Sequence, residues 1–162
     1  PLREYSSADD EFCLCLPDGE LSRMLRLCKS AKRRETGGLL VGRYSDDLRR
    51  AIVKTASDAP GDSRAGSTWF YRGVQGIQRW VDSLWNSDIY YLGEWHFHPS
   101  AAPDPSGTDI AQMEKIATTA SYRCPEPILV IIGGDPSCGW KLRAFVFLRG
   151  RKHIELTERD HN

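Results

Sequence analysis

Two of the four histidines in this sequence, His96 and His98, are separated by a single residue. In a strand, the side chains at i and i+2 leave the same face, so both imidazoles can point at one atom. Asp109 follows them and is expected in the first turn of a helix, with Ser106 three residues before it. Two imidazoles and one carboxylate are a donor set for zinc that leaves the fourth position to a water, as in catalytic sites. The spacing therefore predicts one zinc ion with a bound catalytic water.

Such a site also needs a proton carrier that is not itself a ligand, because bound zinc lowers the pKa of its water to roughly 7. Glu35 is the candidate, since it is expected to close a helix just before Gly37 and Gly38 and could face the metal from a neighbouring strand. A negative charge at a helix C-terminus is disfavoured by the helix dipole, which favours a functional role. The alternative is a solvated helix-end acid beside Arg33 and Arg34.

Each fragment also has a simpler interpretation. Histidines serve as partly buried hydrogen-bonding residues, and Ser106 or Thr108 could be only a helix N-cap, with Asp109 favoured by the dipole. Glu94 shares the strand parity of the two histidines, so it could accept a hydrogen bond from an imidazole N–H. It could equally face solvent past the end of the site. The combination of all these residues, rather than any one fragment, favours a metal centre.

The hydrophobic pattern predicts alternating strands and helices around these residues. Helical spacing covers about 21–31, 74–85 and 110–120, and strands are expected at 11–16, 39–42, 51–56, 69–71, 89–99, 128–132, 141–148 and 153–157. Prolines 99, 103 and 105 restrict the segment between His98 and Ser106, which lowers the entropy lost when the helix start returns to the strand. This order predicts a mixed α/β fold with helices on the faces of a mixed sheet. Residues 57–67 should form a loop with Arg64 at its centre, either as a contact for an incoming chain or as an ordinary flexible connection.

Length and composition narrow the class of protein. The 162 residues predict one domain, 1–162, with a core at about 11–157 and a short polar C-terminal tail. Twenty-two basic residues balance twenty-two acidic ones, which argues against a nucleic-acid or membrane surface. The longest apolar run, residues 128–132, is far shorter than the ~20 residues that span a bilayer. Five cysteines without a C-x-x-C pair indicate free thiols in a reducing cytoplasm.

The cysteines allow two other hydrolytic chemistries to be considered. Cys124 or Cys138 could act as a nucleophile with His153 as base, but no neighbouring residue supports this. A zinc deaminase would need H-x-E followed by P-C-x-x-C, and here the order is Cys124-Pro125 with no second cysteine at that spacing. Buried, inert thiols are therefore the better interpretation of the cysteines.

His96-x-His98, seven residues, and then Ser106-x-x-Asp109 resembles the signature of the JAMM metalloproteases, also called MPN+ or JAB1/Mov34. The upstream segment 35–42, Glu-Thr-Gly-Gly-Leu-Leu-Val-Gly, is similar to the glutamate-bearing segment of that family. The order of strands and helices from about residue 11 to 148 agrees as well. The resemblance implies a JAB1/MPN domain of three layers, related to the cytidine deaminases, in which helices flank a curved mixed sheet.

The resemblance also implies roles for individual residues. Zinc would be bound by His96, His98 and Asp109, with Glu35 as general base and then acid, and Ser106 as the hydroxyl that steadies the oxyanion. Every position of the motif is filled, unlike in the inactive MPN relatives.

The sequence looks most like the bacterial stand-alone JAB proteins, and among these it is similar to the deconjugating peptidases of type II CBASS antiphage operons. That likeness implies a zinc isopeptidase acting after the C-terminus of a ubiquitin-like conjugate. Its substrate would be a protein with a flexible C-terminal tail, such as a cyclic-nucleotide synthase conjugated by an E1/E2-like enzyme, with no role for nucleic acid or membrane. One alternative keeps the metal and trims sulfur-carrier proteins or cell-wall peptides. Another is a non-catalytic MPN scaffold that only binds partners.

Overall fold

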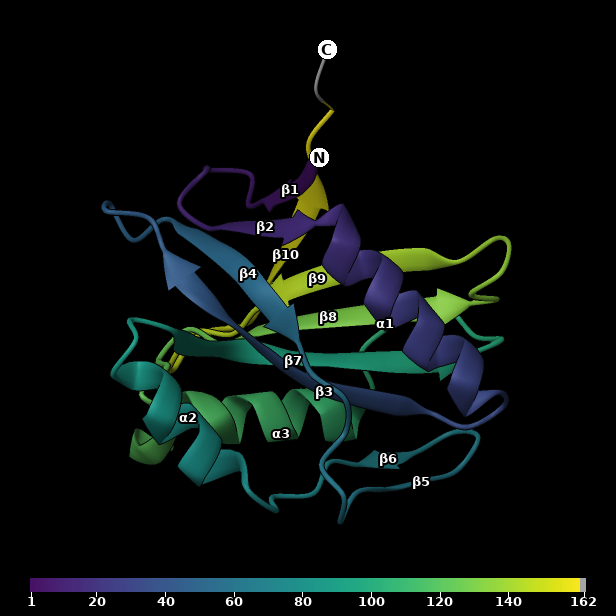
Figure 1. The fold of residues 1–162 in the computed structure, drawn as a ribbon. Coiled ribbons are helices and arrows are strands. Elements are labelled where there is room, and N and C mark those ends of the chain that lie inside the picture. Colours follow the sequence, from purple (N-terminus) through teal and green to yellow (C-terminus); the bar gives the residue numbers. More distant parts are fainter. Residues whose placement is uncertain (161–162) are drawn as a thin grey trace.

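The computed structural model describes residues 1–160, and its main feature is a mixed sheet of eight strands that closes on itself in the order β1-β10-β9-β8-β7-β3-β4-β2 (Figure 1). The strands are β1 (Leu2–Ser6), β2 (Cys13–Pro17), β3 (Thr36–Tyr44), β4 (Arg50–Ala56), β7 (Tyr90–Pro99), β8 (Ile128–Gly134), β9 (Lys141–Val146) and β10 (Ile154–Glu158). The pairs β2·β4 and β7·β8 are parallel and the others antiparallel. A separate hairpin joins β5 (Arg64–Ala65) and β6 (Phe70–Tyr71).

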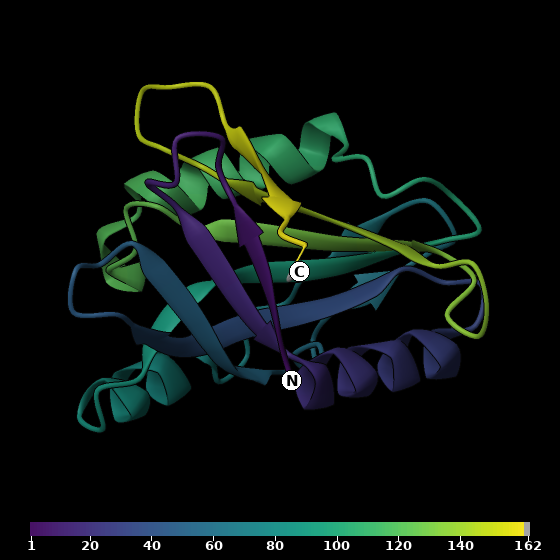
Figure 2. The same ribbon diagram turned by 90° about the horizontal axis from the view of Figure 1, so that it is seen from above.

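Three α-helices cover the two faces of the sheet. They are α1 (Asp18–Ala31), α2 (Ile77–Trp85) and α3 (Gly107–Thr118), and a short 3₁₀ turn, η1 (Ala120–Tyr122), follows α3. Figure 2 shows α1 and α3 on opposite sides of the strands. One apolar cluster joins α1 to one face, and a second joins α2 and α3 to the other.

Alternation along the central strands explains the two clusters. On β8, Leu129 and Ile131 belong to the cluster with α2 and α3, whereas Val130 and Ile132 belong to the cluster with α1. A strand that is apolar at every position is buried on both faces. The mixed α/β fold with helices flanking a curved sheet is thus confirmed.

The sheet differs from the expectation in its closure. β1 was not predicted, because two consecutive charged residues, Arg3 and Glu4, interrupt its short sequence, yet it pairs with both β2 and β10 and closes the sheet. The expected loop at 57–67 contains the first strand of the β5–β6 hairpin. No helix within residues 1–160 has both the length and the apolar character needed to cross a membrane.

Candidate metal centre

The central strand β7, which lies between β3 and β8, positions the two histidines. Trp95 and Phe97 point into the cluster beneath α1. The side chains that alternate with them, His96 and His98, therefore leave the opposite face. Both residues are buried, with exposed fractions of 2% for His96 and 9% for His98. Strand parity thus brings the rings to one place, as predicted.

Asp109 is held at the start of α3 by a reciprocal pair of hydrogen bonds. The Asp109 backbone N–H donates to Ser106 Oγ (3.0 Å), and the Ser106 backbone N–H donates to Asp109 Oδ2 (2.9 Å). This capping box fixes the carboxylate beside the histidines. Asp109 Oδ1 lies 3.0 Å from His96 Nδ1, and Oδ2 lies 3.4 Å from His98 Nε2.

Glu35 reaches the same place from the neighbouring strand. Helix α1 ends at Ala31, so Glu35 follows a short turn rather than closing the helix, and β3 begins at the next residue. The antiparallel register pairs Thr36 with Phe97, so one further step places Glu35 opposite His98. Glu35 Oε1 lies 3.3 Å from His98 Nε2, and the residue is only 9% exposed. It is therefore not the solvated helix-end acid that was the alternative.

Burial and neighbouring charges set the protonation of these groups. Burial alone would raise the pKa of Asp109, but hydrogen bonds with His96 and His98 outweigh it and hold this pKa well below its usual range. Burial raises the pKa of Glu35 against the attraction of His98. For His98, burial acts to lower the pKa, but the hydrogen bond to Asp109 and the negative charge of Asp109 outweigh burial and raise the pKa. Asp109 is thus the more acidic of the two carboxyl groups.

The chemistry of the donors fits a zinc ion. His98 Nδ1 lies 3.3 Å from the Ala102 carbonyl, which can only accept, so Nδ1 carries the proton and Nε2 is the nitrogen free for a metal. Two donors about 2.0–2.1 Å from a tetrahedral zinc are roughly 3.3 Å apart, close to the 3.4 Å between His98 Nε2 and Asp109 Oδ2. His96 Nε2 is buried without a hydrogen-bond partner. An orphaned buried nitrogen is unusual in a site without a ligand.

The donor side chains nevertheless contact one another directly. Within residues 1–160, no three His, Cys, Asp or Glu side chains are already arranged so that they could hold a metal ion together. Binding of one ion by His96, His98 and Asp109 therefore requires contacts between these side chains to be replaced by contacts to the ion.

Gly37 leaves room for the His96 ring. A Cβ at this position would lie 2.2 Å from the Trp95 carbonyl oxygen and 3.0 Å from His96 Cδ2. We expect Gly37→Ala to lower the free energy of unfolding by roughly 1–3 kcal/mol, because the strand pair would have to move apart. Urea denaturation of the metal-free protein measures this loss. Gly19→Ala is the matched control, because a Cβ there meets nothing within 4 Å, and an equal loss in both variants would refute the packing argument.

The β5–β6 hairpin contributes residues that the sequence did not single out. The Glu35 backbone N–H donates to the Gly66 carbonyl (2.7 Å). The Phe70 ring meets the His96 ring edge to face, with centroids 5.3 Å apart. The only sequence signal for this hairpin was the short strand expected at 69–71, which did not reveal its contact with the site. Arg64, the predicted contact for an incoming chain, lies in β5 and is exposed.

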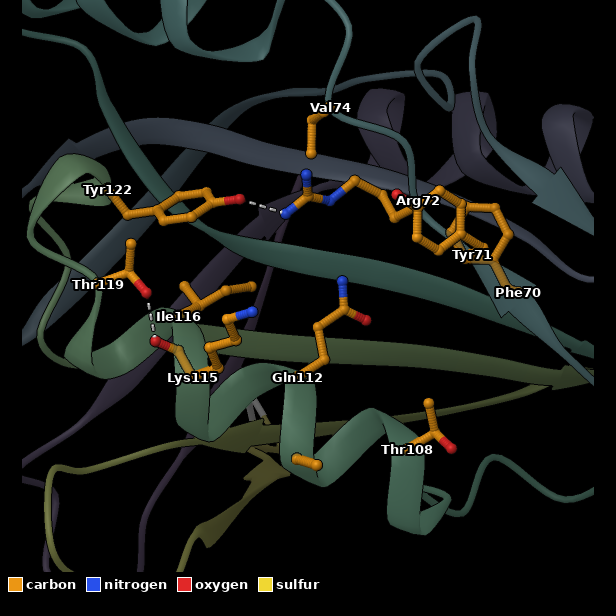
Figure 3. Close-up of a pocket in the computed structure, with 11 residues that line it drawn as sticks. Phe70, Tyr71, Arg72, Val74, Thr108, Gln112, Lys115, Ile116, Thr119 and Tyr122 are labelled. Carbon is orange, nitrogen blue, oxygen red and sulfur yellow. Dashed lines mark hydrogen bonds between the residues drawn. The ribbon is translucent and has the colours of Figure 1, made fainter.

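A groove of about 490 Å³ runs between the β5–β6 hairpin and α3 (Figure 3). Its walls are Phe70, Tyr71, Arg72 and Val74 on one side and Thr108, Ala111, Gln112, Lys115, Ile116, Thr119 and Tyr122 on the other. Two lining residues also connect to the centre, because Phe70 contacts His96 and Thr108 precedes Asp109. The groove therefore borders the centre through these two residues.

Glu94 neither accepts a hydrogen bond from an imidazole nor faces solvent, which were the two expectations from the sequence. It lies on the histidine face of β7, as strand parity predicted, but it is fully buried rather than solvent-exposed. Its carboxylate accepts hydrogen bonds from Arg72 and Tyr91 rather than from an imidazole. No sequence signal linked Glu94 to Arg72, because the two residues are far apart along the chain.

Of the two cysteines considered as nucleophiles, Cys124 is buried as expected, whereas Cys138 is exposed rather than buried. All five are free thiols. Burial raises the pKa of Cys124 to about 11, and its Sγ faces the Tyr44 hydroxyl and the Leu92 carbonyl. The ring of His153 packs instead on Phe147, with centroids 5.0 Å apart.

Comparisons with known proteins agree with the geometry. The family described as "Prokaryotic homologs of the JAB domain" matches residues 17–146. A protein of Enterobacter hormaechei named "CD-NTase/cGAS isopeptidase" is 40% identical over 154 residues, which are 95% of this chain and 86% of the relative. A Sinorhizobium fredii protein named "Probable metalloprotease y4qB" is 25% identical over 81% of each chain. The solution structure of a Desulfitobacterium hafniense protein shares the fold, with a TM-score of 0.62 and 18% identity over 91% of this chain and 88% of that one.

Proposed function

Since the chain belongs to the family of prokaryotic homologs of the JAB domain, we propose that it is a zinc-dependent isopeptidase. In this proposal it hydrolyses the bond after the C-terminus of a conjugated protein and acts as a deconjugase in CBASS antiphage signalling. The observation that carries the proposal is that Glu35 Oε1 and Asp109 Oδ2 lie 3.3 Å and 3.4 Å from the same atom, His98 Nε2. The CD-NTase isopeptidase name of a 40% identical relative supports the substrate class.

We assign the metal to His96, His98 and Asp109. When bound there, zinc would supply Lewis acidity toward the scissile carbonyl and make its water acidic enough to react at neutral pH. The Ala102 carbonyl fixes the tautomer of His98, and the capping box fixes the Asp109 carboxylate. The tautomer of one proposed ligand and the helix-start position of another would thus be set before the ion arrives.

We assign proton transfer to Glu35. Its carboxylate takes a proton from the attacking water and later hands it to the amine that leaves, so that water and the amide bond give a carboxylate and a free amine. Burial suits this role, because the raised pKa of Glu35 brings it closer to the range in which a carboxyl group both accepts and returns a proton.

Ser106 can act as a cap and as an oxyanion donor at the same time. Its Oγ accepts from the Asp109 N–H, which leaves its own hydroxyl proton free to donate. Ser106 is exposed at the N-terminus of α3, where the helix dipole favours a developing negative charge. These two facts support Ser106 as the group that stabilises the oxyanion of the tetrahedral intermediate.

The substrate tail would lie extended in the groove between the hairpin and α3. Such a tail can add to β6 through backbone hydrogen bonds, which fix its register. The groove walls are apolar or neutral apart from Lys115 and the buried Arg72. A flexible C-terminal tail with small residues next to the cut would fit this path.

Filling the groove should impair catalysis without unfolding the protein. We expect Ala111→Trp to lower kcat/KM by roughly tenfold or more, which is about 1.4 kcal/mol or more of lost binding. Ala111 is an exposed residue of α3 that lines the groove, so the larger ring would occupy the path of the tail. Steady-state kinetics with a conjugate substrate give the ratio. Glu114→Trp adds the same ring to an exposed position of α3 outside the groove, and an equal loss there would exclude the groove as the binding path.

The function itself is tested with defined substrates. The purified protein is mixed with a cyclic-nucleotide synthase that an E1/E2-like enzyme has joined through its C-terminus to another protein. Mass spectrometry should then show the synthase released with its C-terminal residue intact. Cleavage of sulfur-carrier precursors or cell-wall peptides with no release of the synthase would replace the proposed substrate. Binding without any cleavage would favour a scaffold.

We place the reaction in the cytoplasm, where the five free thiols would stay reduced.

A further inference from the structure

A buried ion pair lies next to the metal centre, and the proposed mechanism does not use it. Arg72 Nε donates to Glu94 Oε1 at 2.7 Å, and the two side chains are only 2% and 0% exposed. The Tyr91 hydroxyl donates to the other oxygen of Glu94. Taking two charges out of water is costly, so such a pair is retained only where its geometry is well satisfied.

Arg72 connects three parts of the molecule. Besides Glu94 on β7, its guanidinium donates to the Tyr122 hydroxyl at 2.6 Å and to the Gly73 carbonyl at 3.0 Å. Tyr122 belongs to η1, which follows α3. Figure 3 shows the guanidinium pointing across the groove toward Tyr122. A planar fork of donors can hold several partners in fixed directions, which a lysine cannot do.

Arg72 holds the β5–β6 hairpin, and this hairpin contacts Glu35 and His96. Arg72 directly follows β6, the second strand of the hairpin. The hairpin reaches the centre through Gly66, which accepts from the Glu35 backbone N–H, and through Phe70, which packs on the His96 ring. Glu35 precedes the first residue of β3, so this bond, rather than the β3–β7 pairing, occupies its backbone N–H.

We propose that Arg72 is a positioning residue. By fastening the β5–β6 hairpin to Glu94 on β7, it keeps the Gly66 carbonyl on the Glu35 backbone and the Phe70 ring against His96. Glu35 is thereby held opposite His98 before substrate binds. The importance of this placement for catalysis rests on the proposed function, whereas the placement itself can be tested without any activity.

The test is amide hydrogen exchange of the metal-free protein, followed residue by residue by NMR. In Arg72→Met/Glu94→Gln, which removes both charges together, we expect the Glu35 amide to exchange at least about tenfold faster than in wild type, which corresponds to about 1.4 kcal/mol of lost protection. Amides of the central strand β8 should keep their wild-type rates. Arg143→Met is the matched control, because Arg143 is a surface guanidinium that pairs with Glu155 on β10.

Tyr122→Phe provides a milder variant in case the double variant does not fold. It removes one hydrogen bond to Arg72 and keeps the ring that packs on Tyr91 at 4.7 Å. The Glu35 amide should again exchange faster than in wild type, by a smaller factor. An unchanged Glu35 exchange rate in the folded variants would overturn the proposal.

Activity provides a separate readout. In the variants at Arg72 and Tyr122, kcat should fall while the bound metal per chain is unchanged, because the ligands themselves are untouched. If wild type cleaves no conjugate, the proposed function fails, and amide exchange still decides whether Arg72 positions Glu35.

Discussion

Replacing Glu35 with glutamine is expected to lower kcat by about 10²- to 10⁴-fold, the usual contribution of a positioned general acid or base. Glutamine keeps the shape and volume of the side chain but cannot accept the proton of the attacking water. Glu35 is buried and its Oε1 lies 3.3 Å from His98 Nε2, so the amide should remain in place. Because Glu35 is not assigned as a ligand, the bound metal should not change. Single-turnover kinetics on a conjugate, together with metal analysis, measure both quantities.

Two comparisons make this result specific. Glu114→Gln makes the same chemical change on the exposed surface of α3 and should leave kcat within twofold of wild type, which is about 0.4 kcal/mol. Full activity in a folded, metal-loaded Glu35→Gln variant would remove Glu35 from the mechanism. Loss of metal together with activity would instead make Glu35 a ligand.

Replacing His98 with alanine should abolish both metal binding and turnover. The Nε2 atom of His98 faces both Glu35 and Asp109, so alanine removes the nitrogen that lies next to both carboxylates. Mutating an outer-shell partner of a metal ligand costs about 10- to 100-fold in affinity, and we expect the loss of a ligand to exceed that. Titration with zinc, followed by competition with a chelator, gives the affinity.

His153→Ala is the matched control for this loss. The His153 ring stacks on Phe147 and meets Phe145 edge to face, so its removal changes an aromatic contact and not the metal centre. This variant should bind zinc as wild type does. Equal weakening in His98→Ala and His153→Ala would show that the metal lies elsewhere.

Local periodicity was sufficient to predict the face on which the histidines lie. Because side chains alternate along a strand, His96 and His98 share a face of β7 whatever the rest of the fold does. The position of Asp109 also followed from local chemistry, since Ser106-x-x-Asp109 is a capping box at the start of a helix. Both features depend only on residues that are close along the chain.

Features that depend on distant residues were not predicted. Strand β1 pairs with β10 at the other end of the chain, so nothing local indicated that the sheet closes. The burial of Glu35 depends on the register between β3 and β7, so no local pattern decided between its expected role at the metal and the alternative of a solvated helix-end acid. The partner of Glu94 was missed for the same reason, because Arg72 reaches it from a hairpin that no periodic pattern revealed.

The most direct test of the account is the metal content of the protein purified without added metal. Mass spectrometry of the native protein, with elemental analysis, counts the zinc ions per chain. The account predicts one zinc per chain in wild type and in Glu35→Gln, and a marked loss in His98→Ala. A folded wild-type protein that contains no zinc and takes up none at micromolar concentration, or a His98→Ala variant that retains its zinc, would contradict it.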